Sequence, residues 1–291
     1  MTDKHKHEID EVTGVHTTGH EWDGIKELNK PLPRWWVWVF YASIIWSIGY
    51  WIAYPAWPTL TSYTHGMLDY SQRKQVMDEV AAGKAAQAKF VTAIASETVD
   101  QIQKNPELRE FAIAGGRAAF GDNCAGCHGR GAQGGPGYPN LNDDDWLWGG
   151  TLDQIEHTLQ VGVRSTDPET RQNQMPRFGL DQMLEPAQIS DVADYVLSLS
   201  GTTGDQAAIE RGKQIFAEQC VACHGENAKG NMELGSPNLT DGIWLYGKSR
   251  ADVVATITNG RGGVMPTWGG RLDPATIKML AVYVHSLGGG Q

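Results

Sequence analysis

The fold of this 291-residue chain is decided by two stretches of its sequence, Cys124-Ala125-Gly126-Cys127-His128 and Cys220-Val221-Ala222-Cys223-His224. Both follow the pattern Cys-x-x-Cys-His, in which two thiols form thioethers with the vinyl groups of a porphyrin and the histidine supplies one axial nitrogen to the iron. An isolated Cys-x-x-Cys also suits a redox dithiol or half of a zinc site. Because both copies end in histidine and lie 96 residues apart, we predict two covalently bound haem c groups. All four cysteines lie in these motifs, which leaves none for a structural disulfide.

The sequence repeats itself around the two motifs. An offset of 96 residues pairs Gly116 with Gly212 and Phe120 with Phe216 in the predicted helices before them. After each motif come Pro-Asn-Leu, Trp-Leu, Met-Pro and a closing helix that starts with proline, in the same order in both copies. The repeat predicts a mainly α protein with two tandem cytochrome c domains, residues 106–201 and 205–291.

A methionine in a downstream loop is predicted to be the sixth iron ligand of each haem. Met175 and Met265 lie 47 and 41 residues after His128 and His224, and each precedes a proline that stiffens its loop. Sequence order favours Met175 for the first haem and Met265 for the second, but an exchange of these loops between the domains stays open. Two six-coordinate irons have no position for a substrate, so the pattern favours electron transfer.

Other side chains are weaker candidates for the haem sites. Arg164 and Arg261 lie in related glycine-flanked loops and are predicted to contact haem propionates, with ordinary surface arginines as the alternative. Trp146 and Trp244 either line the haem pockets or belong to the core. The remaining methionines and histidines that we considered are expected to pack or to be solvated rather than to bind iron or another metal: Met183, Met232, Met279, His157, His285, His5, His7, His16 and His20.

The uncharged stretch from Trp35 to Trp57 predicts one transmembrane helix. Its 23 residues would extend about 34 Å as a helix, close to the ~30 Å thickness of the hydrocarbon core. Aromatic residues gather towards both ends, and the stretch is too long and starts too late for a cleaved signal peptide. We expect residues 35–57 to be retained as a single-pass anchor.

The segments on either side of this span have different compositions. Residues 1–34 are polar and are expected to form a mobile tail, and Lys26, Lys30 and Arg34 favour a cytoplasmic N-terminus. Residues 58–105, which are mostly Ala-rich and charged, are expected to form a solvent-exposed helical spacer. Because haem c is attached on the periplasmic side in bacteria, both the spacer and the haem domains should be periplasmic.

The composition is mildly acidic, with 34 Asp and Glu against 24 Lys and Arg and a formal net charge of -10. This balance disfavours a nucleic-acid partner and is compatible with a basic protein partner. Between residues 111 and 291 there are 20 Asp and Glu and 13 Lys and Arg, which would attract a basic donor cytochrome c at low salt.

One further block of sequence is more specific than the haem motifs. The stretch Trp22-Asp23-Gly24-Ile25-Lys26-Glu27-Leu28-Asn29-Lys30-Pro31-Leu32-Pro33-Arg34-Trp35-Trp36, joined to one span and two haem c motifs, resembles the CcoP (FixP) family, the dihaem subunits of cbb3-type cytochrome c oxidases. The resemblance covers nearly the whole chain and is to the single-span form of the family. The residues that match the family pattern are Cys124, Cys127, His128, Met175, Cys220, Cys223, His224 and Met265.

The resemblance implies a place in an electron-transfer chain. Electrons would pass from a donor cytochrome c through the two haems to the monohaem cytochrome subunit, and on to a haem–copper catalytic subunit that reduces oxygen and pumps protons in the bacterial inner membrane. This chain would then not be an enzyme on its own. The alternatives are an anchored shuttle that serves several oxidases and a dihaem cytochrome c peroxidase, against which the two Met-Pro loops argue.

Overall fold

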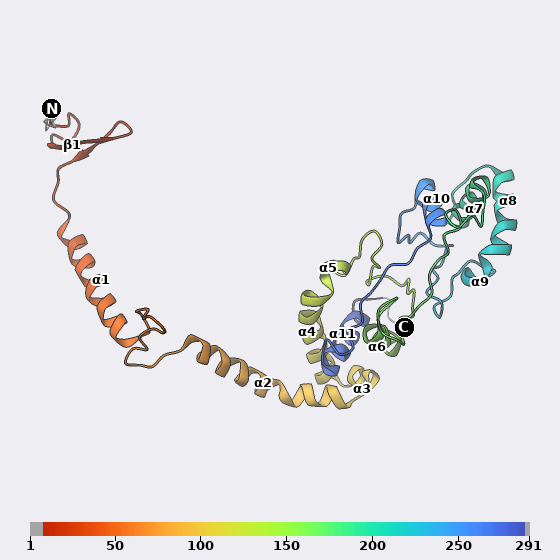
Figure 1. Ribbon diagram of the computed structural model, residues 1–291, viewed down its shortest axis with the longest axis horizontal. Helices are drawn as coiled ribbons and strands as arrows, with labels where there is room; N and C mark the ends of the chain where they lie inside the picture. The colour runs from red at the N-terminus through yellow and green to blue at the C-terminus, as the bar shows by residue number, and fades with distance from the viewer. Residues whose placement is uncertain (1–7, 289–291) are drawn as a thin grey trace. The chain divides into compact units, whose positions relative to one another are not determined.

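The computed structural model describes residues 8–288 (Figure 1), and the chain clusters into two packed parts that meet between Lys84 and Ala85. The described residues are mostly helical, as the sequence predicted. The N-terminal part contains β1 (Thr17–Trp22), β2 (Ile25–Leu28), α1 (Arg34–Ala53) and the beginning of α2 (Gln72–Ser96).

The N-terminal segment is not a featureless tail. Strands β1 and β2 form an antiparallel hairpin in which Trp22 pairs with Ile25. Asp23 and Gly24 connect them with φ of 48° and 83°, the left-handed values that a tight two-residue hairpin turn requires. The expectation of a mobile tail was therefore wrong for residues 17–28, because the Asp-Gly turn signal outweighs the polar composition around it.

Helix α1 is the one helix among the described residues that is long and apolar enough to cross a membrane, and none of its side chains is buried. Its 20 residues correspond to about 30 Å of helix. The observed helix ends at Ala53, four residues before the end of the predicted span of residues 35–57, because Pro55 interrupts it. The chain then folds back on the helix end, where the amide of Met67 donates to the carbonyl of Ile52.

The C-terminal part contains two hydrophobic cores, which we call the first and second lobes. In the first lobe, the last helix packs against the helices that surround the first Cys-x-x-Cys-His motif. In the second lobe, the closing helix of the first repeat packs against the helices around the second motif. The first lobe consists of α3 (Val99–Lys104), α4 (Pro106–Asn123), α5 (Ala125–His128), α6 (Leu152–Val161) and α11 (Pro274–His285); the second consists of α7 (Pro186–Leu199), α8 (Gln206–Gln219), α9 (Val221–His224) and α10 (Arg250–Asn259).

The end of the predicted spacer belongs to the first lobe. Helices α2 and α3 fall within the predicted helical spacer, residues 58–105, but Ile94, Val99 and Ile102 are fully buried in the first core. Lys278 of α11 also donates hydrogen bonds to the carbonyls of Ala95 and Glu97 at the end of α2. The expectation of a solvent-exposed spacer was wrong for these residues, because their apolar side chains fill the space beside α11.

The two closing helices are exchanged between the sequence repeats. Helix α7 follows the first motif along the chain but packs on α8, and α11 follows the second motif but packs on α4. The predicted limits 106–201 and 205–291 therefore describe repeats along the sequence, whereas each hydrophobic core combines segments from both repeats.

Candidate functional site

Each Cys-x-x-Cys-His motif forms one turn of helix at the end of a longer helix. In the first motif, the amide of Cys124 donates to the carbonyl of Phe120 at 2.8 Å, and the amide of His128 donates to the carbonyl of Cys124 at 3.0 Å. The second motif repeats these bonds, from Cys220 to Phe216 at 2.9 Å and from His224 to Cys220 at 2.9 Å. This turn brings the two thiols and the imidazole of each motif together, and none of the four cysteines forms a disulfide.

A backbone carbonyl orients each motif histidine. The Nδ1 atoms of His128 and His224 lie 3.0 Å and 3.2 Å from the carbonyl oxygens of Pro139 and Pro237. An Nδ1–H that donates to the carbonyl leaves the Nε2 lone pair for a metal ion. Burial lowers the pKa of both histidines, which favours the neutral form that binds iron.

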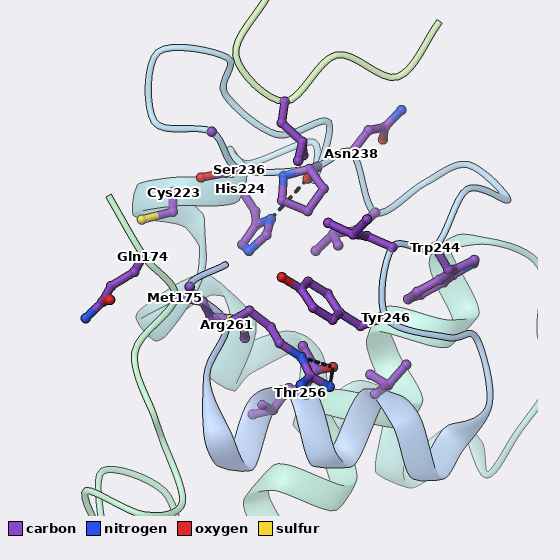
Figure 2. Close-up of a pocket in the computed structure, with 18 of the residues that line it drawn as sticks. Gln174, Met175, Cys223, His224, Ser236, Asn238, Trp244, Tyr246, Thr256 and Arg261 are labelled. Carbon is purple, nitrogen blue, oxygen red and sulfur yellow. Dashed lines mark hydrogen bonds between the residues drawn. The ribbon is translucent and has the colours of Figure 1, made fainter. Parts of the chain in front are cut away.

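A cavity of about 520 Å³ lies in front of the second motif (Figure 2). Cys220, Cys223 and His224 line one side of it, and Met175 from the first repeat also contributes to its wall. Figure 2 shows His224, Met175 and Tyr246 directed into the same space from different segments. The volume lies in the range of a cofactor site, and the thiols, the imidazole and the thioether are the groups that haem c requires. The residues present therefore fit this cofactor.

Other walls of the cavity are mostly apolar and come from both repeats. Phe178, Leu184 and Val192 from the first repeat face Phe216 and Trp244 from the second. Trp244 thus lines the cavity, whereas its counterpart Trp146 packs against the first core. Burial raises the pKa of Cys220 to about 11, with a smaller contribution from Cys223. An apolar wall around the motif would exclude water from a bound porphyrin.

The two methionines are held by a crossed arrangement of their loops. The amide and carbonyl of Met265 pair with those of Val163 at 2.9 Å, and the amide of Met175 donates to the carbonyl of Arg261 at 2.9 Å. Met265 packs against the first core, which contains Cys124. The structure thus brings Met265 to the first motif and Met175 to the second, opposite to the order in which they follow the motifs in the sequence.

The two predicted arginines both line the cavity at the second motif. Arg261 donates to the hydroxyl of Thr256 from Nε at 3.1 Å, and its guanidinium stacks on the ring of Tyr246 at 4.3 Å. Arg164 comes from the first repeat and donates from Nε to the carbonyl of Gly263 at 2.6 Å. The sequence interpretation treated these arginines as counterparts, but the structure places both at one motif.

The alternative ligands lie elsewhere. Met279 is buried against Gly115, whereas Met183 and Met232 are exposed, so only the first of these fills a core. His157 is exposed on α6 and His285 is half-buried at the end of α11. His16 and His20 belong to the hairpin region, and residues 8–288 contain no cluster of histidine, cysteine and carboxylate side chains suited to a metal ion. His5 and His7 lie outside the described residues.

Comparison with known proteins identifies the family to which the chain is related. Residues 14–61 match the family described as the N-terminal domain of cytochrome oxidase-cbb3, FixP; residues 113–200 match cytochrome c, and residues 207–284 match cbb3-type cytochrome c oxidase subunit III. Cytochrome c domains bind haem c and transfer electrons, so this chain is a membrane-anchored haem c protein of electron transport.

Relatives match along almost the entire chain. The FixP subunit of the cbb3-type cytochrome c oxidase from Bradyrhizobium sp. (strain ORS 278) is 59% identical over 98% of both chains. The FixP subunit from Azorhizobium caulinodans is 57% identical over 99% of this chain and 98% of its own. The CcoP subunit from Azospirillum brasilense is 55% identical over 98% of this chain and 99% of its own. The chain belongs to the FixP (CcoP) family of cbb3-type cytochrome c oxidase subunits.

Proposed function

We propose that this chain binds two covalent haem c groups with crossed methionine ligands. The first haem is attached to Cys124 and Cys127 and the second to Cys220 and Cys223. Their axial ligands are His128 with Met265 for the first haem and His224 with Met175 for the second. The observation that carries this proposal is the exchanged pairing of the two methionine loops with the two motifs.

The side chains around each haem have separate tasks. When bound, each haem supplies a one-electron ferric–ferrous couple. The carbonyls of Pro139 and Pro237 would orient His128 and His224 so that Nε2 is available to bind iron, and the apolar wall at the second motif would keep water away from the haem there. Arg164 and Arg261 contact propionates of the second haem, because both line its cavity.

We further propose that the chain is not an enzyme on its own. With Met265 and Met175 as second ligands beside His128 and His224, neither iron would have a position for peroxide, which disfavours a dihaem peroxidase. The chain receives electrons from a donor cytochrome c and passes them to the monohaem cytochrome subunit and the haem–copper catalytic subunit of a proton-pumping oxidase. The names of the relatives support this place in the complex rather than a free shuttle that serves several oxidases.

The proposed location is the bacterial inner membrane, with α1 as the single span. Lys26, Lys30 and Arg34 before the span support a cytoplasmic N-terminus. The two haem lobes then lie in the periplasm, where haem c is attached.

The crossed ligands can be tested in variants that keep only one haem. Replacing Cys220 and Cys223 by alanine leaves the first haem alone. In this background, Met265→Ala should abolish the methionine–iron absorption band, and Met175→Ala should leave the band unchanged. The opposite result would assign each methionine to the haem of its own repeat and would overturn the crossed pairing.

A further inference from the structure

The two repeats differ by an insertion between α6 and Met175. From Gly137 and Gly235 to the end of α6 and α10, counterparts are separated by 98 residues, as are Gly162 and Gly260, whereas the two Met-Pro pairs are separated by 90. The backbone ladder pairs Val163 with Met265 and Arg261 with Met175. Val163 is therefore the counterpart of Arg261, and the eight additional residues of the first repeat, 164–171, have no counterpart in the second.

The insertion ends with Arg171, which lies beside Val163, the residue that corresponds to Arg261 of the second repeat. Residue 171 bridges Val163 in the backbone, and the amide of Arg164 donates to the carbonyl of Arg171 at 2.7 Å. The Cα atom of Arg171 therefore lies next to Val163, the counterpart of Arg261.

The side-chain contacts of the two arginines are equivalent. Arg171 donates from Nε to the hydroxyl of Thr158 at 3.1 Å, and its guanidinium lies 5.2 Å from the ring of Trp148. Arg261 makes the same two contacts, at 3.1 Å and 4.3 Å. Its partners Thr256 and Tyr246 are the counterparts of the first pair at the offset of 98.

The aromatic partners are themselves placed equivalently. The Trp148 ring lies close over Gly235 of the second repeat, and the Tyr246 ring lies over Gly137 of the first. These glycines are also separated by 98 residues. Each arginine therefore stacks on a ring that contacts the other repeat. The two repeats thus match in the aromatic residues and glycines as well as in the arginines.

Neither arginine forms an ion pair with a carboxylate of residues 8–288. Arg171 is half-buried, and burial lowers its pKa. A partly desolvated guanidinium without a counter-charge is unfavourable unless an anion binds to it. A carboxylate ligand at this position would supply that charge and accept two parallel hydrogen bonds.

We propose that Arg171, oriented by Thr158 and Trp148, binds a propionate of the first haem, as Arg261 does at the second. This inference rests on the proposed function. It also gives Arg164 a distinct role, because Arg164 lies in the insertion and has no counterpart in the second repeat. Arg164 is then an additional cation at the second haem that the first haem lacks.

Redox titration of the full-length haem-loaded chain tests the proposal. A nearby cation favours the reduced haem, which carries one positive charge fewer. Arg171→Gln should lower the midpoint potential of one of the two haems and make it depend on pH, since the propionate loses its counter-charge. Arg261→Gln should do the same to the other haem. The matched control is Arg271→Gln, because Arg271 stacks on Trp268 at 4.4 Å in the first lobe but is exposed.

The outcomes separate this inference from the proposed function. If Arg171→Gln shifts the same haem as Arg261→Gln, or shifts no haem more than Arg271→Gln does, Arg171 is not a propionate ligand. If mass spectrometry of the wild-type chain shows fewer than two covalently bound haems, the proposed function itself is overturned. If Arg171→Gln fails to incorporate haem, Thr158→Val replaces it, because loss of the orienting hydroxyl should shift the same haem by a smaller amount.

Discussion

At the scale of single residues, Asp145 is a half-buried carboxyl group that the haem ligation does not explain. It lines the cavity of the second motif, and burial together with the charges of Asp241 and Asp143 raises its pKa to about 6. An acid whose pKa is raised by folding stabilises the folded state while it is protonated. That stabilisation is complete below the unfolded pKa of 3.8 and is lost as the pH rises through about 6.

Asp145→Asn should therefore increase the free energy of unfolding above about pH 7, by about 1 kcal/mol after allowance for solvent screening, and should have little effect near pH 4. Denaturant titrations at the two pH values measure this difference. Asp144→Asn is the control, since Asp144 is its exposed neighbour. A gain that is equal at both pH values would show that the titration of Asp145 is not its cause.

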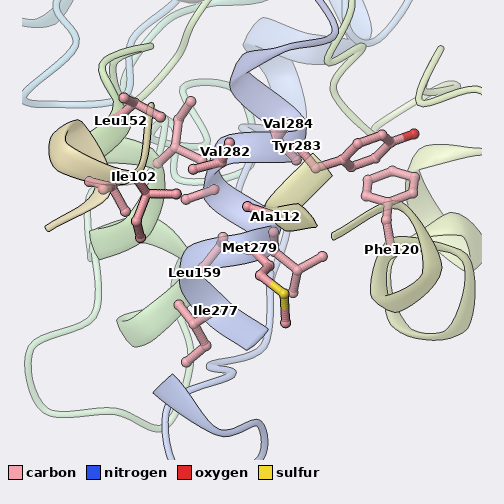
Figure 3. Close-up of a cluster of buried hydrophobic side chains, with 14 of the residues drawn as sticks. Ile102, Ala112, Phe120, Leu152, Leu159, Ile277, Met279, Val282, Tyr283 and Val284 are labelled. Atoms are coloured by element: carbon pink, nitrogen blue, oxygen red, sulfur yellow. The ribbon is translucent and has the colours of Figure 1, made fainter. Parts of the chain in front are cut away.

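At the scale of helices, close packing depends on a glycine in each of α4 and α8, the helices that precede the two motifs. A Cβ atom on Gly116 would lie 2.2 Å from the carbonyl oxygen of Met279, and one on Gly212 would lie 2.1 Å from that of Asp191. Figure 3 shows Met279 and Tyr283 of α11 beside Ala112 and Phe120 of α4. The closing helices approach so closely that only glycine fits.

Gly116→Ala should reduce the free energy of unfolding by about 1–3 kcal/mol, because α4 and α11 would have to separate. Gly121→Ala lies in the same helix with nothing within 4 Å of its Cβ and should be neutral or stabilising by up to about 1 kcal/mol. Thermal unfolding followed by circular dichroism compares the two variants. Equal effects would mean that the contact with α11 is not tight in solution.

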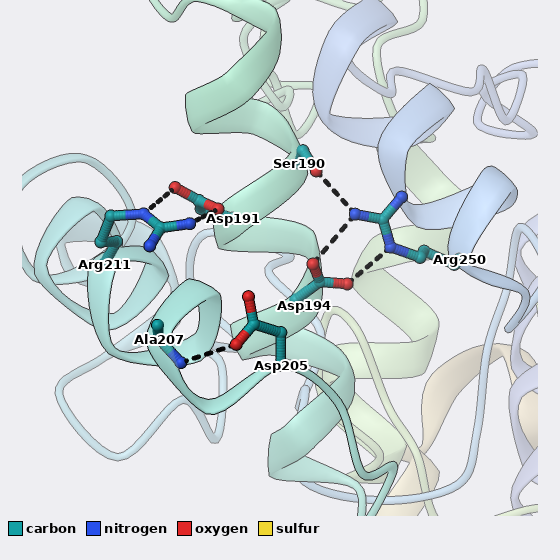
Figure 4. A network of polar contacts seen from close by, with 7 residues as sticks. All are labelled: Ser190, Asp191, Asp194, Asp205, Ala207, Arg211 and Arg250. Carbon is teal, nitrogen blue, oxygen red and sulfur yellow. Dashed lines mark hydrogen bonds and ion pairs between the residues drawn. The ribbon is translucent and has the colours of Figure 1, made fainter.

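The closing helices α7 and α11 differ in the charges on the face that packs on the neighbouring helices. In the second lobe, Arg211 pairs with Asp191 at 2.7 Å and Arg250 pairs with Asp194 at 2.6 Å (Figure 4). At the equivalent positions, the first lobe has apolar contacts. The residues there are Gly115 with Met279 and Leu152 with Val282. If each closing helix packed within its own repeat, both arginines and both aspartates would lose their partners, so these pairs favour the exchanged arrangement.

At the scale of the whole molecule, the exchange makes the lobes depend on each other. A chain that ends at Gly204 lacks both α11 and Met265, although it keeps the first attachment motif. Its haem should show no methionine–iron absorption band, and its first core should lose the helix that covers α4. A chain that begins at Ala85 keeps both lobes and should retain the bands. A normal methionine band in the chain ending at Gly204 would contradict the exchange.

The charge of the haem region should govern its encounter with a donor. Residues 111–291 contain 20 Asp and Glu and 13 Lys and Arg, which attracts a basic cytochrome c over distances that salt screens. The rate at which the chain oxidises such a donor should fall as ionic strength rises, as stopped-flow measurements can test. An acidic donor of similar potential is the control and should show no such fall. Rates independent of salt for the basic donor would exclude electrostatic docking.

Several features were predictable because local chemistry determines them. The Cys-x-x-Cys-His spacing predicted both motif turns, and proline at the first helical turn predicted the closing helices, observed at Pro186–Leu199 and Pro274–His285. The hairpin was missed although its Asp-Gly signal was present. Arg171 could not be recognised, because an insertion moves it away from Arg261 in an alignment and only the backbone ladder brings the two side chains into equivalent positions.

The Cys-x-x-Cys-His motifs, the apolar stretch, the two repeats and the family resemblance could all be read from the sequence, because each depends on composition or on residues that are close along the chain. Which closing helix covers which motif, and which motif each methionine loop lies beside, emerged only from the folded chain. Two similar repeats offer nearly the same local geometry in either pairing. The choice therefore comes from contacts between distant residues, such as the contact of Met279 with Gly115 and the ion pair of Asp194 with Arg250, which no local pattern contains.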